Sequence, residues 1–433
     1  MNTTLSLFLL LSVPGVPLLL ALPALHSRLS WPCHLAILPA VILLLTPAVF
    51  SIEVPWLLFG TGLGVGGASR LLLAMSVVLW AAVATLLRLP TSRSADNRLA
   101  TFFLLTMAGN LGTIIATGLV GFFAFSTLMG YGFYGLLVTT GNAGARRAGR
   151  AYLGLLILAD LALFEVLLIT AATTGDLGFE AVHHAMAQSS SLGLYLSMVV
   201  FAFAAKAGVW PLHFWLPLAF RSARPTVALL LGGVPVAMAL FGMVRWLPLG
   251  EITSPKLGLI IQSIGVAAML YAILTGLIRA QLKLLPAYAA IITTGLFVTA
   301  LGAGLADPAA WAEYKSLAHF YIVSLGFGLA VLAATIGWLQ ARREYPATPA
   351  MQTDDSIPWF ERWPGTVVRW GAKIGLDILP GLRSSWLAKV GCLRQICARQ
   401  RTLDNIERSL QRWTFASTLL LLLAMVSVFL AAC

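Results

Sequence analysis

The sequence predicts an all-α polytopic membrane protein with about 12 transmembrane helices, the seventh of them discontinuous. Apolar residues fill 59% of the 433 positions, charged residues fill only 10%, and the mean hydropathy is +0.90. A soluble domain with this composition would lack the polar residues needed to cover its surface. Apolar runs of about 20 residues, the length that a helix needs to cross a bilayer, follow one another along most of the chain.

The apolar runs give the positions of the expected spans. They are residues 3–24, 35–50, 69–88, 98–117, 119–141, 150–173, the helix that carries Lys206, and then 225–248, 256–278, 284–304, 314–338 and 413–433. Between the second and third spans, a glycine-rich and partly alternating stretch predicts a short hairpin at the surface.

Cationic side chains concentrate in alternate loops. These loops contain Arg88, Arg93 and Arg98; Arg146, Arg147 and Arg150; Arg221 and Arg224; Arg279 and Lys283; and Arg342 and Arg343. Short loops rich in lysine and arginine stay on the cytoplasmic side of a membrane. We therefore expect a multi-pass protein of a bacterial inner membrane with its N-terminus outside. The net charge of +12 is then a topology signal and predicts no nucleic-acid partner.

One stretch, residues 206–226, combines ionisable residues with prolines inside an apolar region. Pro211 removes a backbone donor and interrupts the helix that carries Lys206, and Pro217 follows soon after. Broken helices at membrane depth occur where they are buried in protein or line a wet cavity, and intramembrane charges usually have a function. The stretch thus favours a discontinuous helix that presents Lys206 to an ion path. The alternative is an interfacial loop with snorkelling cations.

The same stretch resembles a known family. Lys206, Pro211, Leu212 and His213 precede Trp215, Leu216 and Pro217, and Pro225, Thr226, Leu230, Leu231 and Gly233 follow. This pattern resembles the antiporter-like membrane subunits of respiratory complex I, Mrp cation/proton antiporters and membrane-bound hydrogenases. The resemblance covers roughly residues 50–340. It implies two inverted five-helix repeats, of which the second is only partial here, and a switchable proton on Lys206.

The family partner of that lysine is a glutamate of the fifth helix, and Thr127 stands at its position. The next helix contains Asp160 and Glu165, and Asp160 lies about ten residues into its span, near the bilayer midplane. Burial favours a neutral amine and a nearby carboxylate favours a charged one. We therefore expect Asp160 to replace the missing acid; alternatively, Asp160 only joins helices through polar contacts.

Two further positions depart from the family pattern. Ala237 stands where a relay lysine is common, and Val323 ends a motif that otherwise retains Lys315 and His319. Spacing by four keeps Lys315, His319 and Val323 on one helix face. His319 is either a proton carrier or a hydrogen-bonded core histidine. The expected proton path therefore consists of Lys206, Asp160, Glu165, His213, Lys315 and His319.

The expected organisation has five parts. They are N-terminal helices with a surface hairpin (1–97), a first five-helix repeat (98–248), a partial second repeat (249–340), a cytoplasmic amphipathic segment (341–412) and a last helix (413–433). Helical spacing of apolar residues in 341–412 favours helices lying on the membrane or on a partner subunit. The alternative is a solvated tail.

These features predict a membrane subunit that moves protons, or exchanges cations for protons, within a multisubunit complex. The resemblance implies coupling to NADH/quinone or hydrogenase-type redox chemistry or to an ion gradient, with this chain at most a non-catalytic subunit. One alternative is a degenerate structural subunit that docks partners; another is a coupling subunit for bicarbonate or sodium uptake. No phosphate loop, nucleophile elbow or metal-type cysteine spacing occurs in the sequence, so we expect no cofactor and no metal.

Overall fold

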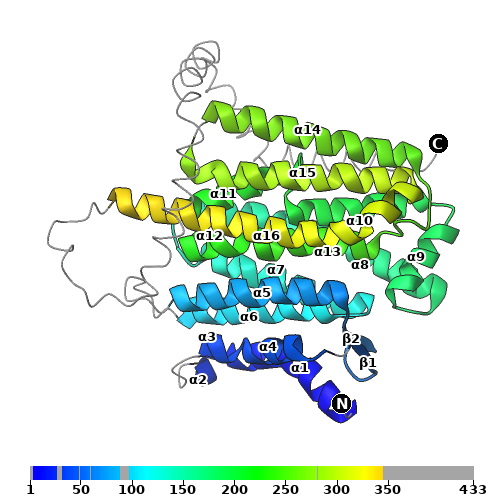
Figure 1. Cartoon of the computed structure of the whole chain (residues 1–433), viewed down its shortest axis with the longest axis horizontal. Coiled ribbons are helices and arrows are strands. Elements are labelled where there is room, and N and C mark those ends of the chain that lie inside the picture. The colour runs from blue at the N-terminus through cyan, green and yellow to red at the C-terminus, as the bar shows by residue number, and fades with distance from the viewer. Residues whose placement is uncertain are drawn as a thin grey trace.

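The computed structural model describes residues 3–26, 32–47, 49–58, 60–87, 97–279 and 281–344 (Figure 1). The predicted last helix, residues 413–433, and all but the first four residues of the predicted amphipathic segment lie outside the described residues. The architecture is therefore that of the chain up to Glu344.

The helices and strands follow one another along the chain with short connections. They are α1 (Thr3–Leu20), α2 (Pro23–His26), α3 (Pro32–Leu35), α4 (Leu38–Leu45), β1 (Phe50–Val54), β2 (Thr61–Val65), α5 (Gly67–Leu86), α6 (Asn97–Ile115), α7 (Leu119–Val138), α8 (Ala143–Thr174), α9 (Phe179–Gln188), α10 (Leu192–Ala207), α11 (Trp215–Ser222), α12 (Pro225–Leu231), α13 (Ala237–Trp246), α14 (Pro255–Arg279), α15 (Leu285–Ala306) and α16 (Pro308–Glu344).

The long helices confirm the predicted all-α membrane class. Within the described residues, nine helical segments are long and apolar enough to cross a membrane, and two shorter apolar segments lie at Thr4–Leu20 and Pro32–Leu45. The long helices run roughly parallel or antiparallel to one another in layers, with α1 and α4 at one side and α14 at the other (Figure 1). The total of about 12 spans stays a prediction.

The predicted hairpin is present. Strand β1 pairs antiparallel with β2, from Phe50 opposite Val65 to Val54 opposite Thr61. One isolated bridge joins Leu63 of the hairpin to Ala116 in the α6–α7 connection, and a second joins Gly118 of that connection to Gly178, directly before α9. In Figure 1 the hairpin and α9 lie at the same end of the long helices. We call this end, where α5 begins and α13 finishes, the hairpin end.

Two long helices are interrupted inside the bundle. The first interruption, between α10 and α11, is the break predicted from Pro211. The second is a π-helical turn at Gly232–Val236, which separates α12 from α13 within the predicted span 225–248. Pro235 lies in this turn and has no backbone N–H to donate, so a regular α-helix cannot continue through it.

The connection after α8 also differs from prediction. Ten of the residues that follow α8 form the helix α9, although no helix was predicted there. Phe179 at its start packs edge-to-face against Phe122, with ring centroids 5.8 Å apart. Helix α9 therefore forms because its apolar residues reach the hairpin end of the core, a long-range contact with no local signal.

Glycines allow α6 and α7 to approach closely. A Cβ added at Gly109 would lie 2.3 Å from the backbone nitrogen of Met129, closer than any real contact. Without water to drive association, membrane helices gain stability from this kind of close backbone packing. The α6–α7 contact also positions a side chain of α7 that belongs to the candidate functional site described below.

We predict that Gly109→Ala destabilises the protein by about 1–3 kcal/mol, because the added methyl must push the α7 backbone away. Thermal unfolding of the purified full chain in detergent measures the effect. Gly328→Ala is the matched control, since its added Cβ meets nothing within 4 Å and alanine favours a helix. Equal unfolding temperatures for the two variants would contradict the close packing of α6 and α7.

Candidate functional site

The break between α10 and α11 is stabilised by its own residues. Helix α10 ends at Ala207, and Gly208 adopts the left-handed conformation with φ of 69°. The Val209 N–H donates to the carbonyl of Ala204 at 2.9 Å, and the indole N–H of Trp215 donates to the carbonyl of Ala205 at 3.1 Å. Carbonyls at a helix end need such donors when water is excluded. The chain can thus turn inside the bundle, directly after Lys206.

Lys206 contacts side chains from two neighbouring helices. Its Nζ lies 2.6 Å from Oδ1 of Asp160 on α8 and donates a hydrogen bond to Oγ of Ser126 on α7 at 3.1 Å. The Lys206 and Asp160 side chains are only 6% and 9% exposed. The structure therefore places Asp160 in direct contact with Lys206, and the two groups join α7, α8 and α10 at the start of the break.

The Lys206–Asp160 pair has few other polar partners. In the described part of the chain, no hydrogen-bond donor reaches Oδ2 of Asp160. Removing two charges from water costs several kcal/mol per ion, which their mutual attraction offsets only at short distance. The 2.6 Å separation meets that condition. Each charge therefore depends strongly on the other, and moving one of them away would leave an uncompensated buried charge.

Four other residues of the expected proton path lie elsewhere. Glu165 is exposed on α8, and five residues of helix rotate it about 140° away from Asp160. Lys315 is also exposed, on α16. His213 is buried at the break, with its ring centroid 4.6 Å from that of Tyr271 on α14. The structure thus does not bring Glu165 or Lys315 to the Lys206–Asp160 pair.

His319 belongs to a different part of the bundle. It is half-buried on α16, and its ring centroid lies 6.2 Å from that of Phe241 on α13. Both residues line a cavity at the hairpin end, discussed below. No contact in the described part of the chain joins His319 directly to Lys206.

The positions that depart from the family pattern carry no charge. The Oγ1 of Thr127 is buried and has no hydrogen-bond partner among the described residues, whereas Ser126, one residue earlier, contacts Lys206. Adjacent helical residues point about 100° apart, so only one of the two can face the lysine. Ala237 is fully buried just after the π-helical turn, and Val323 is half-buried on α16.

Arg245, near the end of α13, is a residue that sequence reasoning missed. Its Nη1 donates to the carbonyl of Ala116 at 2.6 Å, and its guanidinium carbon lies 4.2 Å from the centre of the Phe179 ring. Its own carbonyl lies 3.1 Å from Nε2 of His183, whose Nδ1 lies 3.1 Å from Oε1 of Glu251. An arginine near the end of a span usually anchors the helix in the headgroup region, which gave no reason to select it.

We predict that Asp160→Asn lowers the free energy of unfolding by about 3–5 kcal/mol, because the Lys206 ammonium then has no counter-charge. The double variant Asp160→Asn with Lys206→Met should regain most of this loss. Glu165→Gln is the control, since an exposed acid on the same helix should change stability by less than about 0.5 kcal/mol. Chemical unfolding of the purified chain provides the measurement. Equal losses for Asp160→Asn and Glu165→Gln would contradict the buried pair.

Comparison with known proteins identifies the family. Residues 116–340, about half of the chain, match the model of the family described as NADH:quinone oxidoreductase/Mrp antiporter, TM. The chain is 30% identical over 239 residues to the NADH-quinone oxidoreductase subunit N of Ectopseudomonas mendocina, an alignment that covers 54% of this chain and 48% of that protein. The chain thus spans about half the length of this curated relative.

Solved structures show the same fold. A chain of the membrane-bound sulfane sulfur reductase, an archaeal respiratory membrane complex, matches with a TM-score of 0.64 and 18% identity, over 76% of this chain and 70% of that one. A chain of the Mrp complex from Dietzia sp. DQ12-45-1b matches with a TM-score of 0.62 and 21% identity, over 79% and 66%. With the break, the helical bundle and the family match together, the chain belongs to the antiporter-like membrane subunits of the NADH:quinone oxidoreductase/Mrp antiporter family.

Proposed function

We propose that the chain is a membrane subunit that translocates protons, or exchanges cations for protons, with the Lys206 amine as the proton-loading group. The observation that carries this proposal is the buried contact between Lys206 and Asp160 beside the helix break. Lys206 is the only buried lysine among the described residues, so the described bundle offers one such loading site.

The geometry supports a loading and release cycle. While Asp160 stays 2.6 Å from Lys206, the carboxylate stabilises the ammonium form of the lysine. If the carboxylate moves away, burial in a medium of low dielectric constant favours the neutral amine, and the proton leaves. The Ser126 hydroxyl accepts a hydrogen bond from the ammonium and carries a proton of its own, so it can receive or pass on that proton.

The break is the element that we propose to move. Gly208 adopts a backbone conformation that other residues rarely take, and the following turn is held by the hydrogen bond of the Trp215 indole to Ala205. Rotation about Gly208 would change the position of Lys206 relative to Asp160 without unfolding either helix. A partner subunit could then control the Lys206–Asp160 distance by moving α11, which begins at Trp215.

Partners and location are part of this proposal. The related proteins are named as subunits of NADH-quinone oxidoreductases, antiporters and hydrogenases, which supports a place among other membrane subunits of a complex driven by redox chemistry or an ion gradient. We place the chain in a bacterial cytoplasmic membrane with the hairpin end outside. The cluster of Arg146, Arg147 and Arg150 at the opposite end supports this orientation.

A specific observation favours a second candidate, a structural subunit that conducts nothing. Ala237 and Val323 replace ionisable residues of the family pattern, and Lys315 is exposed. The part of the bundle around α16 therefore holds no second buried lysine among the described residues. In that case the Lys206–Asp160 pair would only hold α8 and α10 together.

Proton uptake by membrane vesicles that contain the whole native complex separates the two candidates. We predict that Lys206→Met lowers the flux by about tenfold or more, because the loading group is lost. Glu165→Gln should leave the flux unchanged, since Glu165 is exposed and turned away from Lys206. Immunodetection of the assembled complex controls for folding. Normal flux in an assembled Lys206→Met complex would contradict transport and favour the structural role.

A further inference from the structure

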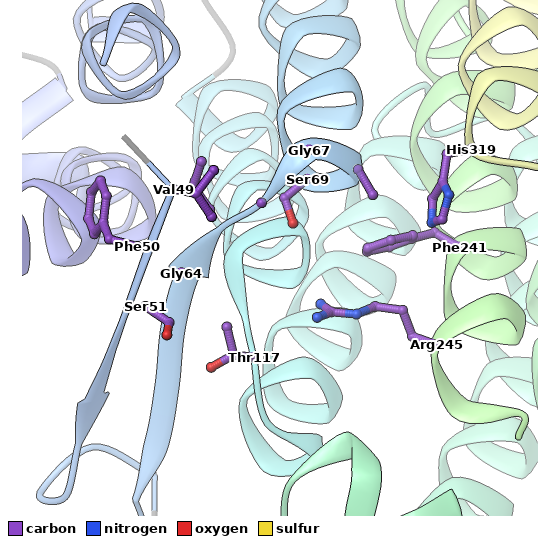
Figure 2. A pocket seen from close by; sticks show the side chains of 13 residues that line it. Val49, Phe50, Ser51, Gly64, Gly67, Ser69, Thr117, Phe241, Arg245 and His319 are labelled. Carbon is purple, nitrogen blue, oxygen red and sulfur yellow. The ribbon is translucent and has the colours of Figure 1, made fainter. Parts of the chain in front are cut away.

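We propose that a cavity at the hairpin end binds a monovalent oxyanion, bicarbonate or a small carboxylate. The cavity, which we call the hairpin cavity, has a volume of about 440 Å³ and lies between the hairpin, the start of α5, α13 and α16 (Figure 2). It shares no residue with the Lys206–Asp160 pair, so the inference stands apart from the proposed transport function.

The cation of the hairpin cavity is Arg245. Figure 2 shows its side chain extending from α13 into the space between that helix and the hairpin. One of its nitrogens is bound to the Ala116 carbonyl, and the ring of Phe179 supports the guanidinium. In the described part of the chain no carboxylate pairs with Arg245, and the Glu251 carboxylate contacts His183. A half-buried guanidinium is costly without an anion, and among the described residues only Nη1 of Arg245 has a hydrogen-bond acceptor.

A helix N-terminus meets the same cavity. The first three residues of α5, Gly67, Ala68 and Ser69, all line the cavity, and their N–H groups have no acceptor within the helix. No side chain of the described residues caps them. The N-terminus of a helix carries about half a positive charge and points its N–H groups outward, which suits an anion. Arg245 and this N-terminus thus approach the hairpin cavity from two sides, and His319 lines it from α16.

Charge and shape indicate the class of anion. One permanent charge from Arg245 and about half a charge from the α5 N-terminus balance a monovalent anion better than a divalent one. Two oxygens on one planar group match the fork of a guanidinium, and bicarbonate and carboxylates have this geometry. The hydroxyls of Ser69 and Thr117 can donate further hydrogen bonds to the anion or to accompanying water.

A substitution at Gly66 can place a carboxylate in the hairpin cavity and so test the anion site. A Cβ added at Gly66 meets nothing within 4 Å, and its φ of −118° suits any residue. Gly66 lines the cavity that Arg245 enters, so Gly66→Asp would supply a tethered carboxylate in place of a free one. Gly66→Asn has nearly the same shape and no charge, which makes it the matched control.

The experiment is thermal unfolding of the purified full chain in detergent, titrated with sodium acetate or sodium bicarbonate against sodium chloride at equal ionic strength. We expect the oxyanions to raise the unfolding temperature of the wild-type and Gly66→Asn proteins by about 2–4 °C at saturation. Without added oxyanion, the unfolding temperature of Gly66→Asp should already be higher than that of Gly66→Asn, and acetate or bicarbonate should not raise it further. Arg245→Gln, if it folds, should not respond either.

Three results would overturn the site. In the first, acetate and bicarbonate raise the unfolding temperature of the wild-type protein no more than chloride does. In the second, they raise the unfolding temperature of Gly66→Asp as much as that of Gly66→Asn. In the third, sodium sulfate raises the unfolding temperature of the wild-type protein and neither monovalent oxyanion does. Because Gly66→Asp and Gly66→Asn differ only in charge, the comparison holds even if Arg245→Gln fails to fold. The vesicle test with Lys206→Met involves neither Gly66 nor Arg245, so either proposal can fail without the other.

Discussion

The attraction between one buried ammonium and one buried carboxylate is the constraint on which this part of the structure depends. Lys206 lies in the last turn of α10, where the helix stops inside the bundle. Its charge is tolerable there because Asp160 lies 2.6 Å away on α8 and Ser126 accepts a hydrogen bond on α7. The break in turn depends on Gly208 and on the Trp215 indole, which give the chain a conformation and a donor that a helix end needs. Packing, helix termination and charge are therefore linked at one point.

The sequence predicted much of the fold because the signals were local. Long apolar runs locate the spans, and Pro211 marks the interruption after Lys206. Alternating, glycine-rich residues marked the hairpin that β1 and β2 form. The expectation that Asp160 lies near Lys206 came from its depth in the neighbouring helix, and the structure places the two in contact. Its role in proton transfer is still a proposal.

Other features could not be predicted because they depend on helix rotation and long-range packing. Depth along a helix does not show which face a residue occupies, so the expected proton path included Glu165, which is exposed, together with Asp160. Thr127 was singled out because it stands at the position of the family's acid, but Ser126 is the residue that contacts Lys206. The hairpin cavity joins residues from four segments far apart in the sequence, and Arg245 has no neighbouring motif that would distinguish it from a membrane anchor.

The charge state of Asp160 is the central claim, and infrared spectroscopy tests it most directly. The measurement is the difference spectrum between the wild-type and Asp160→Asn proteins at neutral pH, with isotopically labelled aspartate to assign the bands. The ion pair with Lys206 predicts that the variant loses the stretching bands of an ionised carboxylate. Loss of a protonated carboxyl band instead would show that Asp160 is neutral beside Lys206, and that result would contradict the account.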